Sequence, residues 1–360
     1  MSILSALLLF GFLVFVHELG HFILAKMSGV KVLKFSLGFG PKVVGRKIGD
    51  TEYLLSAIPL GGYVKMLGQE DVGEADEEAE ASDEGRSYRN KPVLKRALII
   101  FSGPLFNLIT AAVIFFFVFL WGIPTLLPTV GEIMPGTPAE KAQLSKGDRV
   151  VRINGAPIAQ WEDMTKIIYV SANKTLTLKV DRKGEVITLS ITPESKKIKD
   201  LFGEDKEVGL IGVRPSGETF VVKENLPGAA KSAVLKTWEI SALTMTGIVK
   251  LFQRVVPADT IGGPILIFQL AEKQANAGLM SFFVFAAVIS INLGILNLLP
   301  VPVLDGGHLL FLGIEAIRKK PLGEKSVMIA QRIGLSLLLL LMAFAMYNDI
   351  FRLFSGKPLP

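Results

Sequence analysis

The chain has 360 residues, 50% of them hydrophobic, and a mean hydropathy of +0.47. It is too apolar for an ordinary soluble protein, and the composition indicates a membrane protein with a soluble part. The lack of cysteine excludes disulfides and thiolate metal sites, so any metal must be held by His, Asp or Glu. The net charge of +6 comes from basic residues at the ends of apolar segments, which is typical of membrane-flanking loops rather than of a nucleic-acid surface.

The first apolar segment, from Ile3 to about Ala25, is long enough to cross a bilayer and contains His17-Glu18-Leu-Gly-His21. Residues four apart share one face of a helix, so His17 and His21 can hold one metal ion while Glu18 reaches a water molecule beside it. This arrangement is typical of zinc peptidases. The alternative is a buried histidine pair bonded to polar neighbours, but a His-Glu-His cluster within a span is hard to explain as packing. Because no basic region precedes the segment, we expect a retained span rather than a signal peptide.

Residues 29–67 alternate short β-prone runs with glycines and predict a small β-rich unit beside the membrane, on its cytoplasmic side. Gly61 and Gly62 have two interpretations: they form hairpin turns, or they belong to a unit that offers an edge strand to an unwound substrate. The next segment, 70–84, contains nine acidic residues and no Lys or Arg. We expect a solvated loop there.

A second span is expected over residues 97–121, and it completes an N-terminal membrane core of residues 1–121. This span contains Asn107, in the run Gly103-Pro104-Leu-Phe-Asn107. A polar side chain in a span either packs helices together through hydrogen bonds or supports a functional site. Both interpretations of Asn107 stay open.

Residues 122–214 predict a soluble α/β module, with short strands, two helices and turns at Gly147-Asp148 and Asn154-Gly155. The run PGTPAEKAQLSKGDRVVRINGAPI closely resembles a PDZ domain of the bacterial, circularly permuted type. The resemblance implies a groove that takes a peptide as an added strand, often at a free C-terminus. A PDZ-like domain that only restricts access by size is the alternative.

Residues 215–281 are expected to lie at the outer membrane surface. Within them, segment 229–256 is long and fairly apolar, but charged residues are spread along its length: Lys231, Lys236, Glu239, Lys250 and Arg254. This pattern favours one or two amphipathic helices over a fifth span.

The C-terminal membrane core, residues 282–360, contains a third span at 282–299, a loop at 300–308 and a fourth span at about 327–347. Two prolines end the third span, and the loop then holds Asp305 at membrane depth, where a carboxylate is costly unless it binds something. Because a catalytic zinc normally has three protein ligands, Asp305 is the candidate third ligand. His308 is expected to support the site rather than to close it as a fourth ligand.

Lys and Arg near the span ends place the 26–96 and 318–325 loops in the cytoplasm, and the N-terminus and residues 122–281 outside it. With four spans, the first and third run in the same direction. His17 and His21, near the end of the first, then meet Asp305 on the cytoplasmic side. A fifth span over 229–256 would separate the histidines from Asp305.

Together, the HExxH in the first span, FSGPLFN in the second, the PDZ-like run and NLLPVPVLDGG after the third resemble the site-2 protease family of intramembrane zinc proteases. The likeness is to the bacterial regulator-of-sigma-E type, with one PDZ domain where some members carry two. It implies one zinc ion bound by His17, His21 and Asp305, with Glu18 as catalytic carboxylate and Asn297 as active-site asparagine. From the residues alone, Asn297 is also open to a role in helix packing.

The resemblance further implies a multi-pass protein of the bacterial cytoplasmic membrane that cleaves single-span proteins already trimmed on their outer side. Anti-sigma factors and signal-peptide remnants are the expected substrates, with the lipid bilayer as partner and no nucleic acid. Two other functions are alternatives to this interpretation. A metal-binding transporter leaves the spacing of Glu18 and the PDZ-like run unexplained, and a non-catalytic PDZ-bearing scaffold predicts a damaged HExxH, which is intact.

Overall fold

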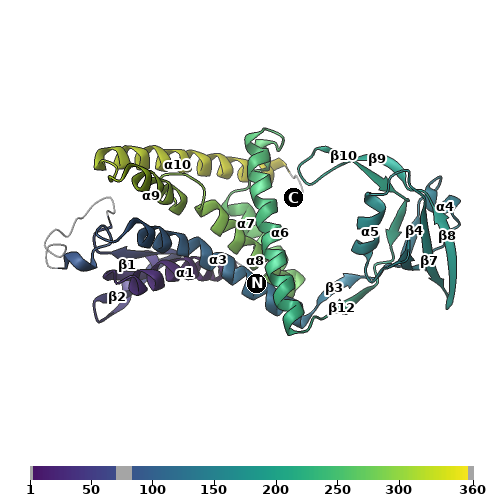
Figure 1. Ribbon diagram of the computed structural model, residues 1–360, viewed down its shortest axis with the longest axis horizontal. Helices are drawn as coiled ribbons and strands as arrows, with labels where there is room; N and C mark the ends of the chain where they lie inside the picture. Colours follow the sequence, from purple (N-terminus) through teal and green to yellow (C-terminus); the bar gives the residue numbers. More distant parts are fainter. Residues whose placement is uncertain (1–2, 70–82, 356–360) are drawn as a thin grey trace. The chain divides into compact units, whose positions relative to one another are not determined.

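The computed structural model describes residues 3–69 and 83–355, which divide into two compact units (Figure 1). The first unit comprises the described residues of Met1–Val118, Ala229–Ile248 and Pro257–Pro360. The second comprises Phe119–Gly228 and Val249–Val256. Each unit is described by itself below.

In the first unit, four of the described helices are long and apolar enough to cross a membrane: α1 (Ile3–Met27), α3 (Val93–Trp121), α8 (Leu279–Asn297) and α10 (Glu324–Ser355). The predicted number of spans is therefore confirmed by helix length and composition. Helices α3 and α10 extend beyond the predicted spans, because polar residues at their ends continue the helix without contributing to the hydropathy pattern.

Glycines let α1, α3 and α8 approach one another closely. A Cβ atom on Gly20 of α1 would collide with the carbonyl oxygen of Ser102 on α3, and one on Gly294 of α8 would lie 3.0 Å from the carbonyl oxygen of Pro104. The hydroxyl of Ser290 on α8 also donates to the carbonyl oxygen of Asn107, at 2.7 Å. Small residues and interhelical hydrogen bonds are the usual means of helix association in a membrane.

Other helices complete the helical part: η1 (Glu84–Arg86), α6 (Leu226–Phe252), η2 (Ala258–Thr260), α7 (Pro264–Ala277) and α9 (Asp305–Arg318). Helix α6 covers the segment expected to be amphipathic, and it is not among the four candidate spans. Most of the acidic segment 70–84 lies outside the described residues.

The expected 300–308 loop is wrong at its C-terminal end, because α9 begins at Asp305. Gly306 and Gly307 allow this early start. A Cβ atom on Gly306 would collide with the carbonyl oxygens of Leu298 and Leu299, and one on Gly307 with that of Val301. The helix can therefore begin directly against the chain that leaves α8.

The β-rich unit consists of two long, irregular strands, β1 (Val32–Ile48) and β2 (Thr51–Met66). Phe35 lies opposite both Val64 and Tyr53, so the first part of β1 lies between the two ends of β2. The Gly62–Met66 segment has β1 on one side only, and within the described part of the chain no strand pairs with its other side. This segment is an edge, and it packs against α1.

The second unit contains a four-stranded sheet with the order β6 (Ala156–Pro157), β5 (Arg149–Ile153), β7 (Leu176–Arg182) and β8 (Glu185–Ile191). Three two-stranded pairs join β3 (Ile123–Leu126) to β12 (Thr219–Val222), β4 (Val130–Ile133) to β11 (Val213–Pro215), and β9 (Glu194–Lys199) to β10 (Asp205–Leu210). Helices α4 (Pro138–Lys141) and α5 (Trp161–Tyr169) complete it, and Met164 and Ile168 of α5 pack into its core. These elements agree with the predicted α/β module, while its assignment as a PDZ domain stays a prediction.

An ion pair between a buried carboxylate, Asp148, and a half-buried guanidinium, Arg182, fixes the turn before β5. The side chain of Asp148 is 1% exposed and accepts hydrogen bonds from Arg182 at 2.7 Å and from the Ser145 amide at 2.8 Å. Burial alone would raise the pKa of Asp148, but the hydrogen bonds from Arg182 and Ser145 and the charge of Arg182 outweigh it, so its pKa is lowered.

We predict that Asp148→Asn destabilises the second unit, because the buried side chain at 148 loses the negative charge that accepts hydrogen bonds from Arg182 and from the Ser145 amide. Since the folded-state pKa of Asp148 is depressed, its contribution is present above the unfolded pKa of about 3.9 and is lost as the pH falls through the folded value. Thermal unfolding of wild type and variant between pH 7 and pH 2 checks this. A difference between the two that does not shrink toward low pH would contradict it.

Candidate metal centre

Helix α1 places two buried imidazoles one turn apart. His17 is 8% exposed and His21 is 7% exposed. Nδ1 of His21 donates to the carbonyl oxygen of Ile99 at 2.8 Å, so in the neutral ring it is Nε2 that carries the lone pair and can bind a metal. The Nε2 atoms of the two rings face each other at 3.2 Å.

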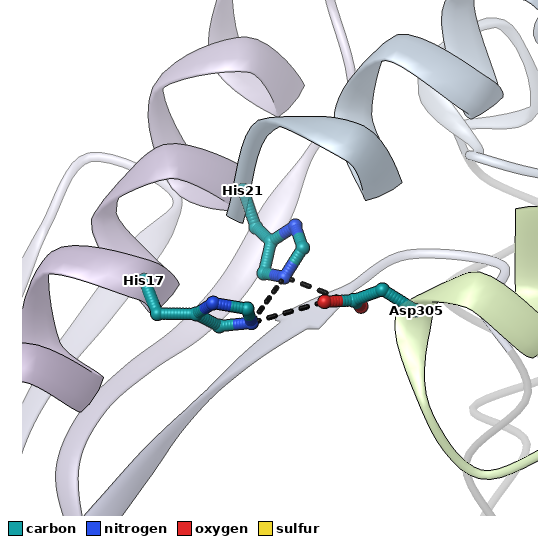
Figure 2. Close-up of side chains that lie close together, drawn as sticks. All are labelled: His17, His21 and Asp305. Atoms are coloured by element: carbon teal, nitrogen blue, oxygen red, sulfur yellow. Dashed lines mark hydrogen bonds and ion pairs between the residues drawn. The ribbon is translucent and has the colours of Figure 1, made fainter. Parts of the chain in front are cut away.

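Asp305 reaches the two histidines from the first turn of α9 (Figure 2). Its Oδ2 lies 3.0 Å from Nε2 of His17, and its Oδ1 lies 3.5 Å from Nε2 of His21. Although His17 is so close, Oδ2 is buried and makes no hydrogen bond. A buried carboxylate oxygen without a donor is costly, and a cation between these atoms removes that cost.

The three ligand atoms fit zinc. Atoms held at about 2.1 Å from a tetrahedral ion lie roughly 3.4 Å from one another, close to the separations seen here. One donor atom from each residue forms a group within 4.8 Å, and His17, His21 and Asp305 are the members of that group. Three protein ligands leave one tetrahedral position open, as a catalytic zinc requires.

A cavity of about 460 Å³ surrounds this centre. All nine residues that the sequence nominated line it: His17, Glu18, His21, Gly61, Gly62, Asn107, Asn297, Asp305 and His308. Gly62 lies close to Glu18, since a Cβ atom there would be 3.3 Å from Cγ of that side chain. The edge segment of β2 therefore borders the same cavity as the metal ligands.

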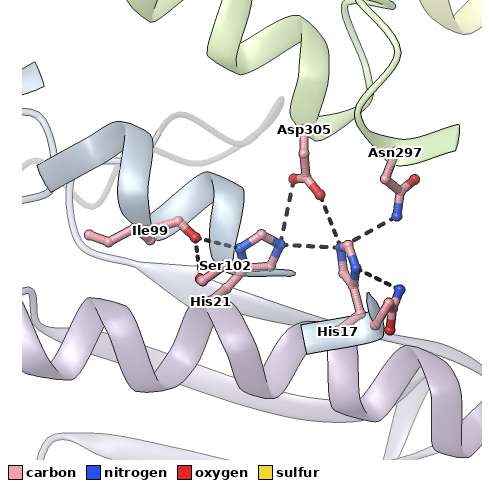
Figure 3. A network of polar contacts seen from close by, with 7 residues as sticks. His17, His21, Ile99, Ser102, Asn297 and Asp305 are labelled. Carbon is pink, nitrogen blue, oxygen red and sulfur yellow. Dashed lines mark hydrogen bonds and ion pairs between the residues drawn. The ribbon is translucent and has the colours of Figure 1, made fainter. Parts of the chain in front are cut away.

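Helix α3 contributes two groups that the sequence did not nominate. The carbonyl oxygen of Ile99 orients the ring of His21 (Figure 3). Gly103 lies directly against both imidazoles, since a Cβ atom there would collide with His21 and lie 2.8 Å from Cε1 of His17. Gly103 precedes Asn107 by one helical turn, and this shared face of α3 was the available signal. The role of the Ile99 carbonyl cannot be predicted from residue types, because every residue carries a backbone carbonyl.

The side-chain amide of Asn107 contacts Nδ1 of His17. The Asn107 amide, in the orientation drawn, places Nδ2 at 3.2 Å from Nδ1 of His17, while its Oδ1 is buried without a partner. If Nε2 of His17 binds a metal, Nδ1 carries the proton and needs an acceptor. Rotating the amide by about 180° supplies Oδ1 at that place. We infer that Asn107 accepts from His17 when metal is bound.

A His-His-carboxylate centre with an open position, set among membrane-spanning helices beside a glutamate, defines an intramembrane zinc metallopeptidase. Comparison with known proteins agrees. A family model described as Peptidase family M50 matches residues 5–341, and the chain belongs to this family.

Among its relatives, proteins bearing the name zinc metalloprotease occur in Rhizobium meliloti and Campylobacter jejuni. The first is 37% identical over 98% of this chain and 97% of its own length, and the second is 37% identical over 97% and 93%. The regulator of sigma-E protease RseP of Escherichia coli is 32% identical over 97% of this chain and 98% of its own length. The chain is thus a zinc metalloendopeptidase of the site-2 protease family, which removes the transporter and scaffold alternatives.

We predict that Gly103→Ala abolishes tight zinc binding, because the added methyl group must displace the imidazoles of His17 and His21. Gly313→Ala is the matched control, since Gly313 also lies in a helix of the first unit but has no atom within 4 Å of an added Cβ. Zinc content of the purified proteins after dialysis measures the effect. Equal zinc content in the two variants would contradict the proposed packing.

We predict that Asn107→Leu, which is similar in size but has no acceptor, weakens zinc binding roughly 10- to 100-fold. Asn107→Asp keeps an acceptor for Nδ1 of His17 and should retain most of the affinity. Competition with a chromogenic chelator compares the two dissociation constants. If Asp weakens binding as much as Leu does, the acceptor role is wrong.

Proposed function

We propose that this protein hydrolyses peptide bonds within the transmembrane segment of single-span membrane proteins, at the centre formed by His17, His21 and Asp305. The observation that carries the proposal is the convergence of these ligand atoms with Glu18 in one cavity. The name of the Escherichia coli relative, regulator of sigma-E protease, supports regulated cleavage and anti-sigma factors as a substrate class. Signal-peptide remnants are a second class with the same chemistry.

His17, His21 and Asp305 hold the zinc ion. When bound there, zinc supplies Lewis acidity, which polarises a carbonyl oxygen and lowers the pKa of a water molecule. Glu18 follows His17 directly on α1 and lines the cavity. Its carboxylate accepts a proton from the attacking water and later delivers that proton to the leaving amine nitrogen.

Asn297 is placed to assist. It is the last residue of α8, and its Nδ2 lies 3.5 Å from Nε2 of His17. Once the lone pair of Nε2 is engaged by metal, this amide N–H is released from His17. It can then donate to the oxyanion that develops on the substrate carbonyl, in the manner of an oxyanion hole.

The edge segment of β2 supports a way to hold an unwound substrate. A helical substrate hides its peptide bonds within its own hydrogen bonds, so part of it must become extended before cleavage. Gly61, Gly62 and Tyr63 line the cavity, and Gly62–Met66 has β1 on one side only. An extended substrate that adds to this edge as a strand would lie beside Glu18.

The N-terminus and the PDZ-like second unit lie outside the bacterial cytoplasmic membrane, and the centre opens toward the cytoplasm. The second unit either binds a peptide terminus or restricts access by size, and α6 lies at the outer membrane surface. The alignment with RseP of Escherichia coli needs 455 positions to cover 97% of this chain of 360 residues, which supports a single PDZ-like domain here.

We predict that Glu18→Gln retains zinc and lowers cleavage of a membrane-spanning reporter at least 100-fold, because the amide cannot accept the proton of the attacking water. Glu162→Gln, which changes an exposed helical glutamate of the second unit, should cleave like wild type. Zinc content and reporter cleavage in reconstituted vesicles are measured together. Undiminished cleavage by Glu18→Gln would remove this residue from the mechanism, and a wild type without zinc would overturn the whole centre.

A further inference from the structure

Asp305 depends on the placement of α9, and apolar packing secures that helix mainly at its beginning. Gly306 and Gly307 are buried against the chain that leaves α8. Beyond this first turn, Leu312 is the one residue of α9 that is buried. Something else must set the direction in which the rest of the helix runs.

A cavity of about 300 Å³ lies along α9, and it shares the lining residues Gln69 and His308 with the larger cavity around the metal centre. Phe311, Leu312 and Glu315 of α9 line it, together with Tyr88 and Arg96. Side chains across a cavity lose the close contacts that would otherwise hold neighbouring elements together. The flank of α9 is therefore not held by close packing here.

One ion pair beside this cavity links α9 to α3. The two terminal nitrogens of Arg96 on α3 donate to the two carboxylate oxygens of Glu315, at 3.1 and 2.5 Å. The side chains are 12% and 16% exposed. The remaining Nε–H of Arg96 donates to the carbonyl oxygen of Lys91 at 3.0 Å, which fixes the guanidinium plane. A two-point contact between planar groups sets both separation and orientation.

The partner helix is the one that orients the histidines. Arg96, Ile99, Gly103 and Asn107 recur at helical spacing and lie along one face of α3. Ile99 contacts His21, and Asn107 contacts His17. Gly103 lies against both histidines. Glu315 follows Asp305 by about 15 Å along α9, at 1.5 Å per residue. Helix α3 thus contacts the histidine ligands directly and the aspartate ligand's helix through Arg96.

We propose that Arg96 and Glu315 form a positioning pair, which sets the orientation of α9 on α3 so that Asp305 meets His17 and His21. A partly buried ion pair adds little net stability, because desolvation offsets most of its attraction. Its geometric constraint is the larger contribution. The inference rests on the zinc centre proposed above and assigns no catalytic role to either residue.

The test measures zinc affinity of the purified full-length protein in detergent, by competition of the apoprotein with a chelator. Glu315→Gln keeps the shape of the side chain and removes its charge, and we expect roughly 10- to 100-fold weaker zinc binding. Arg96→Lys keeps the charge and loses the two-point contact, and we expect a smaller weakening in the same direction. If Glu315→Gln fails to fold, Arg96→Lys decides.

Asp83→Asn is the matched control. It removes the ion pair between Lys31 and Asp83, whose side chains are 20% and 30% exposed. This pair also belongs to the first unit, but it touches no residue of α9. We expect wild-type zinc affinity for this variant. Cobalt substitution adds a direct view of the ligands, because the visible spectrum of cobalt should change in Glu315→Gln and not in Asp83→Asn.

Unchanged zinc affinity in both Glu315→Gln and Arg96→Lys would overturn the inference. So would an equal loss in Asp83→Asn, because the effect would then follow general stability rather than the position of α9. These outcomes are distinct from failure of the proposed zinc centre, in which the wild-type protein itself would bind no zinc.

Discussion

The structure depends on one costly arrangement: two imidazole nitrogens and a carboxylate that face one another at 3.0 to 3.5 Å within a protein interior. Without a cation, the lone pairs of these atoms repel, and Oδ2 of Asp305 lacks a donor. A bound zinc ion replaces this repulsion by attraction, because each lone pair then coordinates the ion. The helices around the centre serve this convergence. Glycines at 20, 103 and 294 let α1, α3 and α8 come close enough to bring the groups together.

Hydrolysis at this depth also needs water, a base and an accessible peptide bond in the same place. The cavity joins these requirements, since Glu18, the ligands and the edge segment of β2 all line it. A regular substrate helix would offer no free peptide group, whereas an extended chain paired to an edge strand exposes its carbonyls. The β unit follows α1 directly in sequence and packs against it, which brings Gly62 beside Glu18.

Much of the centre can be predicted from the sequence, because its residues either lie close together along the chain or are costly to place at membrane depth. His17 and His21 are four apart on one helix, and Asp305 is a carboxylate beside an apolar span. The span count follows from hydropathy. Other features depend on contacts between distant residues. Arg96 and Glu315 are 219 positions apart, and nothing in either neighbourhood pairs them. The carbonyl of Ile99 acts through the backbone, and the placement of β1 between the ends of β2 is a non-local pairing. The start of α9 at Asp305 depends on how Gly306 and Gly307 pack, which composition alone does not reveal.

The split origin of the ligands gives the metal a structural consequence. Among the described helices, His17 and His21 belong to the first and Asp305 to the next to last. Metal binding therefore links two segments that are separated in sequence by the entire second unit. Zinc that binds only the assembled centre stabilises that assembly by mass action. The effect is largest for a helix that packing alone leaves weakly fixed, and α9 is such a helix. Metal, glycine contacts and the Arg96–Glu315 pair thus act on the same degree of freedom, the position of α9 relative to α1 and α3. A change in any one of them should therefore alter the effect of the others.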